Sequence, residues 1–150
     1  MLLAQFKISD EGILEKLDRL DAGMRRDGIR RIVMAGADAE IAEMSERTQS
    51  AHHVRTGQMM QQIGAADYHE ELGGGRVNVY PQGTDSRGVS NAMKAFVINY
   101  GIGRNPTRKG KANRTGDKFI TKQATQAKEK VQKAMAAEAS AIFNEMTGGN

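Results

Sequence analysis

Two long stretches of the chain repeat apolar residues at the spacing of an α-helix. The clearer one covers residues 119–146 and is followed by Gly148 and Gly149, which favour a helix end. Its apolar positions recur at steps of three and four: Ile120, Ala124, Ala127, Val131, Met135, Ala139, Ile142 and Met146. This pattern predicts a long C-terminal helix whose narrow, alanine-rich stripe forms either core or a seam between subunits.

The second helical stretch covers residues 24–50. The positions that fall on one side of this helix are Ile29, Ile32, Val33, Gly36, Ala37 and Glu40. Small side chains at and around Gly36 would let another element approach closely. Glycine in a helix interior costs about 1 kcal/mol relative to alanine. We therefore expect a break between residues 23 and 28, where Gly23 and Gly28 lie.

Residues 2–9 alternate between two faces, with Leu2, Ala4, Phe6 and Ile8 on one of them. This period of two predicts a strand. Ser9 and Asp10 suit the N-cap of a following helix over residues 12–24. The beginning of the chain has an acidic residue early and no long apolar run, so we do not expect a signal peptide.

The middle of the chain carries strand and turn signals. Two short runs flank Gly73–Gly75, which permits positive φ angles, and Val77 and Val79 favour a strand. We predict an antiparallel β-hairpin here, and an exposed loop over residues 81–90. The whole pattern predicts an α+β fold in a single domain over residues 1–150. It has a long N-terminal helix region, a small antiparallel sheet with a hairpin, and a long C-terminal helix packed on the sheet.

Two shorter helices are expected around this hairpin. Before it, the Thr56 hydroxyl can accept a backbone N–H and cap a helix over residues 57–63. After it, residues 91–101 predict a helix that ends at Gly101 as a C-cap. We expect the second helix to turn three apolar side chains inward, those of Ala92, Phe96 and Val97.

The composition limits how dense the core can be. The chain has 150 residues, no Trp, 17 Gly and 9 Met. A loosely packed or extended chain that completes its burial against partner subunits fits these counts better than a tightly packed enzyme. No Cys is present, which excludes disulfides, thiolate metal sites and a cysteine nucleophile. No stretch approaches 18 consecutive apolar residues, so no membrane span is expected.

The positive charge is concentrated in one segment, residues 104–118. Its six cations are Arg104, Arg108, Lys109, Lys111, Arg114 and Lys118. Against them stands Asp117, so the segment carries +5 and the rest of the chain −1, given the total of +4. We predict a flexible basic loop over residues 101–118 that is either solvated or in contact with a phosphate backbone or an acidic partner.

Chemical sites are not indicated by any spacing in the sequence. His52 and His53 are adjacent and would diverge on a helix or a strand, and His69 adds no metal-binding spacing. The carboxylates of Glu70 and Glu71 sit in a polar strand before the glycines, where a solvated hairpin end is expected. We therefore expect no metal, no cofactor and no catalytic residues.

Three short motifs follow one another along the chain. The first is Arg55-Thr56-Gly57, continued by Met59 and by Gln62-Ile63; the second is residues 95–101, with Phe96, Tyr100 and Gly101; the third is Phe119-Ile120 before the C-terminal helix. Their order and spacing resemble the tailed-phage family of small neck proteins, called head–tail joining or tail-completion proteins. The chain departs from that family at several positions, with Gln62 for Ser, Asn99 for Glu, and no prolines around Phe119.

The resemblance implies a structural role and no enzymatic activity. Such proteins form rings, commonly hexamers, between the portal apparatus and the tail tube of the virion, and genomic DNA passes through the ring. The implied partners are other copies of the chain, an adjacent neck or connector protein, the tail-tube protein and double-stranded DNA, with assembly in the host cytoplasm and no membrane. The segment 104–118 would then face the DNA channel or an adjoining ring. The alternative function is a small nucleic-acid-binding module acting through residues 104–118.

Overall fold

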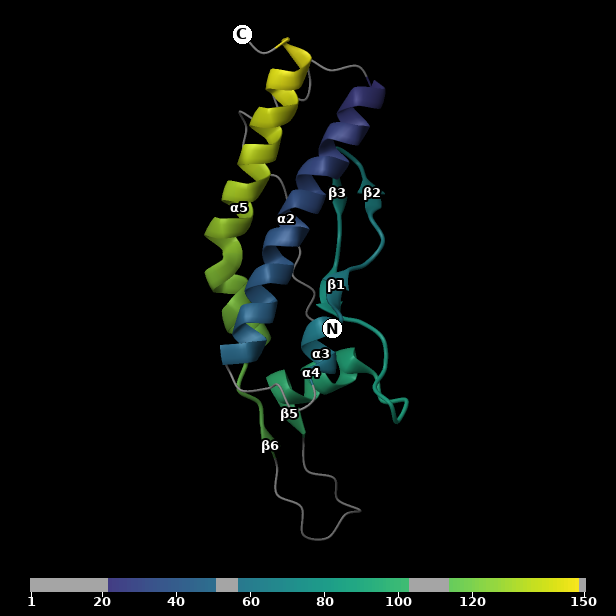
Figure 1. Cartoon of the computed structure of the whole chain (residues 1–150), viewed down its shortest axis with the longest axis vertical. Helices are drawn as coiled ribbons and strands as arrows, with labels where there is room; N and C mark the ends of the chain where they lie inside the picture. The colour runs from purple at the N-terminus through teal and green to yellow at the C-terminus, as the bar shows by residue number, and fades with distance from the viewer. Residues whose placement is uncertain (1–21, 51–56, 103–113, 149–150) are drawn as a thin grey trace.

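The computed structural model describes residues 22–50, 57–102 and 114–148, and the element labels follow Figure 1. The predicted strand over residues 2–9 and nearly all of the helix predicted after it lie outside these residues. The elements are α2 (Ala22–Ser50), α3 (Gln58–Gln61), β1 (Ile63–Ala65), β2 (His69–Glu71), β3 (Gly74–Arg76), β4 (Val79–Pro81), α4 (Asn91–Tyr100), β5 (Gly101–Ile102), β6 (Arg114–Thr115) and α5 (Phe119–Met146).

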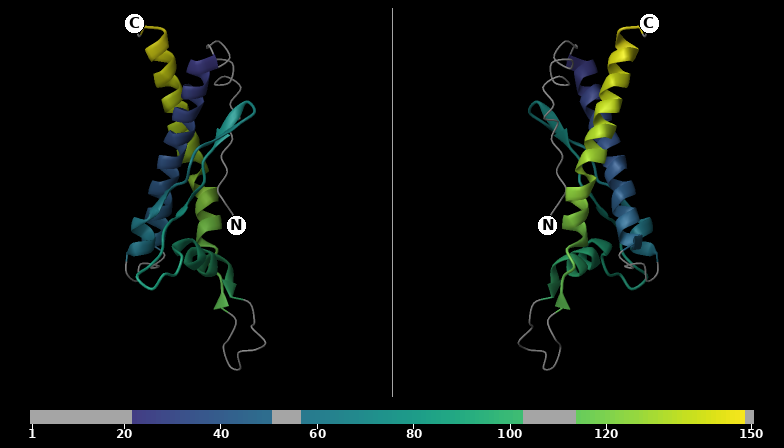
Figure 2. Two further views of the ribbon diagram at one scale, coloured as in Figure 1. Left: turned by 90° about the vertical axis from the view of Figure 1, so that its right-hand side faces the viewer. Right: turned by 90° about the vertical axis from the view of Figure 1, so that its left-hand side faces the viewer.

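The two long helices lie side by side and form the body of the molecule. Figures 1 and 2 show α5 along one side of α2 and the hairpin strands along another. The buried α5 positions are the predicted stripe, with Ala127 and Val131 fully buried and Ile120 partly so. Met146, at the end of α5, is exposed, and the side chain of Ala124 lies outside the described part. The α+β fold is confirmed, because α2, α5 and the strands share one hydrophobic core.

The predicted side of α2 faces that core. Ile32 is fully buried, and a Cβ added at Gly36 would stand 2.9 Å from Met135 Cγ of α5. The small residue therefore allows the close helix approach that the sequence suggested. The expected break at residues 23–28 is wrong, because α2 runs without interruption from Ala22 through a buried Gly28. Packing against the core outweighs the cost of glycine in the helix.

Ion pairs also join α2 to α5 along their solvent edge. The Arg31 guanidinium lies 2.8 Å from Glu138 and 2.7 Å from Glu145 on α5. The hydrogen bond to Glu145 raises the pKa of Arg31 and lowers that of Glu145. Nearer the middle of α5, Lys130 pairs with Glu43, which raises the pKa of Lys130. These pairs orient the two helices around the apolar contact.

The predicted hairpin is present as two short antiparallel ladders. Strands β2 and β3 are joined by the two-residue loop Leu72–Gly73, and Gly73 has a φ of 74°. Strands β1 and β4 continue the same pair of chain segments. In one ladder His69 pairs with Arg76, and in the other Ala65 pairs with Val79. Three residues, 66–68, therefore lie between the ladders on one segment, and only two, 77 and 78, lie between them on the other. One extra residue in the segment 66–68 therefore forms a bulge that bends the hairpin along α2.

Helix α4 forms over the predicted range but presents a different face to the interior. Asn91, Ala95 and Asn99 are buried, whereas Phe96 is 44% exposed and Ala92 and Val97 are half-buried. The expectation that Phe96 packs inward is therefore wrong. The buried side of α4 carries asparagines that form hydrogen bonds, and the spacing of apolar residues does not predict their burial.

None of the helices in the described part of the chain is long and apolar enough to cross a membrane.

Candidate functional site: the junction of α3, α4 and α5

The three motifs that carry the family resemblance meet in space. Met59 from the first, Ala95 from the second and Phe119 from the third form a small buried cluster of their own. Their exposed fractions are 8%, 2% and 7%, and Ile98 and Ile120 pack against them. Segments that are far apart along the chain thus build one structural unit, which we call the motif junction: α3, α4, β5, β6 and the first turn of α5.

Asn99 is the central polar residue of the motif junction. Its side chain is fully buried, and its Oδ1 accepts the backbone N–H of Ile120 at 2.9 Å and that of Thr121 at 3.3 Å. Its Nδ2 donates to Thr121 Oγ1 at 3.2 Å. The residue at the N-cap position of α5, Lys118, makes no side-chain cap bond. Asn99 therefore caps α5 from a different helix and satisfies N–H groups that a local cap would otherwise bind.

A second buried asparagine ties α4 to the end of α3. Asn91 Nδ2 donates to Gln62 Oε1 and to the carbonyl of Gln82, 2.5 and 2.8 Å away. Gln82 in turn donates from Nε2 to the carbonyl of Ala65 at 2.8 Å. Gln62 is thus part of the hydrogen-bond network that positions α4 against the hairpin.

The turn before α4 is closed by Asp85. Its Oδ1 accepts the backbone N–H groups of Arg87 and Val89 at 2.8 and 2.9 Å, and its Oδ2 lies 2.8 Å from Lys94 Nζ. The hydrogen bond from Lys94 is the largest cause of a strongly lowered pKa for Asp85, and the N–H groups add to it. The carboxylate is therefore held in its charged form and keeps residues 85–94 in one arrangement. Ser90 caps α4 by accepting the N–H of Met93.

Strands β5 and β6 form the root of the basic segment. Gly101 pairs with Thr115 and has a φ of 84°. A Cβ at Gly116 would collide with the backbone of Asn99 and Tyr100, so glycine is required for this close approach. The N–H groups of Asp117 and Lys118 donate to the carbonyls of Ile98 and Asn99. The root is therefore fixed to α4 on one side and to α5 on the other.

The outward side of α4 is apolar. Val89, Met93, Phe96 and Tyr100 are exposed by 41%, 58%, 44% and 41%, and the rings of Phe96 and Tyr100 lie 4.8 Å apart. Met93, Phe96 and Tyr100 are spaced by three and four residues and lie on one side of the helix. We call these four residues the α4 face.

The predicted residues are placed as follows. Arg55 and Thr56, and Arg104, Arg108, Lys109 and Lys111, lie outside the described residues. Gly57, with a φ of 73°, occupies the N-cap position of α3, so the prediction that Thr56 is the N-cap is wrong. Phe119 is buried, Gly101 is the C-cap of α4 as predicted, and Phe96 and Tyr100 are exposed. Arg114 lies in β6, and Lys118 has a left-handed backbone with a φ of 57°.

Sequence reasoning missed the role of the asparagines. Asn99 was noticed only as a departure from the family pattern, and Asn91 was not singled out. One available signal was the start of α5, where Lys118 is a poor N-cap. Asp117 next to it accepts the N–H of Phe119, and Asn99 accepts the two N–H groups that follow.

The hairpin end has a shallow pocket of about 450 Å³, lined by Arg25, Arg26, Ile29, Tyr68 and residues 70–74. Burial raises the pKa of the Tyr68 hydroxyl. Glu70 pairs with Arg26 at 2.9 Å and Glu71 with Arg76 at 3.3 Å, so these carboxylates hold the hairpin in place. Within the residues that the structure describes, no three His, Asp or Glu side chains gather as a metal site would require, and His69 is exposed.

Comparison of the chain with protein-family models, with curated proteins and with solved structures finds no match.

Proposed function

We propose that the chain is a non-enzymatic structural subunit of the phage head–tail junction, in a tail-completion or connector role, and that it forms a ring around the DNA path. The observation that carries this proposal is the convergence of the three family motifs in the motif junction. Met59, Ala95 and Phe119, one residue from each motif, pack together in one buried cluster, as we expect if the three motifs act as a unit. The resemblance supplies the role, and the junction supports it.

Two further features support an assembly role. The α4 face leaves four large apolar side chains exposed in one place, which is typical of a surface that another protein covers. The segment 104–118 carries +5, and its described end, residues 114–118, belongs to the same junction, which suits a position near DNA or an acidic neighbour. The virion is the proposed location, and the partners are further copies, an adjacent neck protein and the tail-tube protein.

Deleting the gene for this chain from the phage or prophage that encodes it tests the proposal. We expect the lysate to contain DNA-filled heads and separate tails by electron microscopy, with few joined particles. Supplying the chain from a plasmid should restore joining, and a Phe119→Ala chain should restore it poorly. Normal joined and infectious particles without the chain would reject the proposal.

The second candidate function is a nucleic-acid-binding module, favoured by the six cations of residues 104–118. It predicts that the purified chain retards duplex DNA and that the affinity falls steeply with salt. Replacing Arg108, Lys109 and Lys111 by Gln should then remove binding and lower the salt slope. The matched control replaces Lys122, Lys128 and Lys133 of α5 by Gln, which removes equal charge elsewhere. Absence of retardation at low salt would eliminate this candidate.

A further inference from the structure

The α4 face is the largest group of exposed apolar side chains in the described part of the chain. Seven large hydrophobic residues are exposed there, and four of them belong to this one surface. Phe96 and Tyr100 pack on each other, and Met93 lies three residues before Phe96 on the same side of α4. A contiguous apolar patch on a polar chain marks a surface that is covered in the assembled state.

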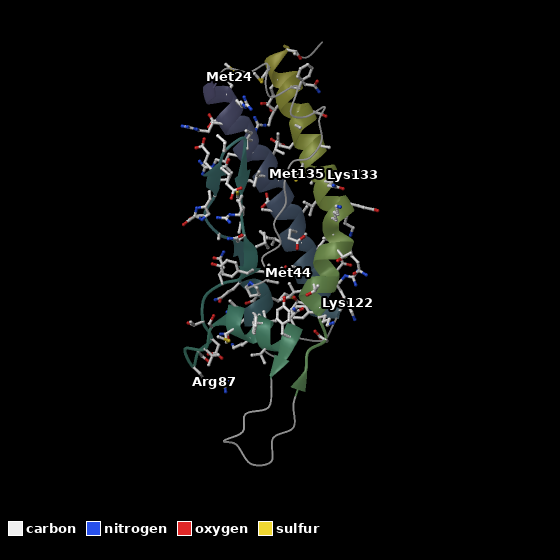
Figure 3. The ribbon with its side chains drawn as sticks, turned by 180° about the vertical axis from the view of Figure 1, so that it is seen from behind. Met24, Met44, Arg87, Lys122, Lys133 and Met135 are labelled. Carbon is white, nitrogen blue, oxygen red and sulfur yellow. The ribbon has the colours of Figure 1, made fainter. Side chains whose placement is uncertain are left out.

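Cations stand at both ends of this apolar surface. Arg87 precedes it and is 77% exposed, and Lys118 and Lys122 are exposed where α5 begins, beside the C-terminal end of α4. Figure 3 shows Arg87 and Lys122 on opposite sides of the motif junction. Two acids lie in this region: Asp85 pairs with Lys94 and lies 3.5 Å from Arg87, and Asp117 beside Lys118 accepts the N–H of Phe119. Each end therefore keeps one positive charge in excess, from Arg87 and Lys94 against Asp85 and from Lys118 and Lys122 against Asp117. The surface that covers the α4 face should therefore carry acids around a flat or small-residue centre.

The outward side of α2 has these properties in its second half. Asp38, Ala42 and Glu46 are exposed and recur every four residues on the side turned away from the core. Ala35 and Ala39 are half-buried beside them. Arg47 is the one basic residue between 32 and 50, and it is half-buried; the cation near Glu46 from α5 is Lys130, which is bound to Glu43. This side of α2 therefore offers two carboxylates and a shallow alanine surface between them.

The two carboxylates on α2 are spaced about as far apart as the ends of the apolar part of the α4 face. Asp38 and Glu46 are eight residues apart, about 12 Å along the helix axis. Met93 and Tyr100 are seven residues apart, about 10 Å along α4. Large side chains on α4 would meet small ones on α2, while the cations at the ends of α4 would reach the two carboxylates.

We propose that the α4 face of one copy docks on the Asp38–Ala42–Glu46 side of α2 in the next copy. The inference rests on the proposed function and identifies the contact between neighbouring subunits of the ring. The contact is heterologous, since two different surfaces meet, and such contacts close into rings when the rotation allows. Docking of one α4 face on another is disfavoured, because it would bring the cations at the ends of the two faces together.

Charge reversal tests the pairing. Sedimentation velocity of the full chain, at the highest concentration that stays in solution, should show multimers. Arg87→Glu with Lys122→Glu should abolish them, and so should Asp38→Lys with Glu46→Lys. Mixing the two reversed variants should restore multimers, because each then offers a complementary surface to the other. A chain that sediments only as a monomer, or reversals without effect or without restoration on mixing, would overturn the proposal.

Cysteine pairing locates the contact directly, because the chain has no native cysteine. Mixing a Phe96→Cys chain with an Ala42→Cys chain should give a crosslinked dimer of the two under mild oxidation. The matched control replaces Ala42→Cys with Ser140→Cys, an exposed position on α5, and should give no such product. Crosslinking of Phe96→Cys chains with one another in preference to Ala42→Cys would contradict a heterologous contact.

The tests of the contact and of the function can fail separately. If deletion of the chain abolishes head–tail joining but these variants associate normally, the function stands and the contact is wrong. If the variants behave as proposed but virions join normally without the chain, the contact stands and the phage role is wrong.

Discussion

The cap that Asn99 provides to α5 allows a quantitative prediction. Asn99→Ala removes the acceptor of two backbone N–H groups, those of Ile120 and Thr121, and the donor to Thr121 Oγ1. The Asn99 side chain has no exposed surface. Loss of an N-cap side chain costs about 1 kcal/mol. Leaving a buried donor without a partner adds about 1–3 kcal/mol. We therefore expect Asn99→Ala to lower the free energy of unfolding by about 2–4 kcal/mol.

Urea denaturation followed by circular dichroism at 222 nm measures this change, because most of the helical signal comes from α2 and α5. Asn144→Ala is the matched control, since Asn144 is an exposed residue of α5, the helix that Asn99 caps, and it should change the free energy by less than about 0.5 kcal/mol. Asn99→Asp keeps an acceptor for both N–H groups and places a negative charge at a helix N-terminus. It should destabilise less than Asn99→Ala.

An effect of Asn99→Ala no larger than that of Asn144→Ala would refute the reasoning. It would mean that water replaces the side chain at the start of α5 without loss. The role of the Asn99 side chain in joining the second and third motifs would then have to be abandoned.

Three further predictions concern the same region. Phe119→Ala should cost about 3 kcal/mol or more in the free energy of unfolding, because it empties the centre of the motif junction; urea denaturation measures it, and a cost below about 1 kcal/mol would contradict the cluster. Met93→Ser, at a position 58% exposed, should leave that free energy within about 0.5 kcal/mol of the original and yet reduce multimers in sedimentation. The lowered pKa of Asp85 means that its stabilisation is present above its ordinary pKa of 3.8 and is lost as the pH falls below it. Asp85→Asn should therefore be less stable than the original chain at neutral pH, and this difference should shrink in acid; a constant difference across the pH series would contradict the assignment.

The long helices were predictable because their signal is spread over many residues. The α5 stripe from Ala127 to Ile142 and the α2 positions around Ile32 repeat at helical spacing, and burial follows that spacing. The hairpin was predictable for a different reason: its turn needs a residue with a positive φ angle, and Gly73 provides it. The bulge was not, because it depends on the register between two distant ladders.

The candidate site was harder to predict, because its residues act across the sequence. Phe96 was expected inside because it is aromatic, but Asn91 and Asn99 occupy the buried side of α4 through hydrogen bonds to Gln62 and to α5. Thr56 was expected to cap α3, but the left-handed Gly57 holds that position. Each error came from judging a side chain by its type alone. The buried side of α4 depends on hydrogen-bond partners more than twenty residues away. The start of α3 depends on the backbone conformation of Gly57.

The most direct test of the account is to locate the chain in intact particles. Virions that carry a small epitope on the exposed C-terminal end of the chain should bind labelled antibody at the point where the tail meets the head. Quantitative mass spectrometry of the same particles should find several copies per virion, as a ring requires. Absence of the chain from purified virions, or label on the capsid shell or tail tip, would contradict the proposed role at the head–tail junction.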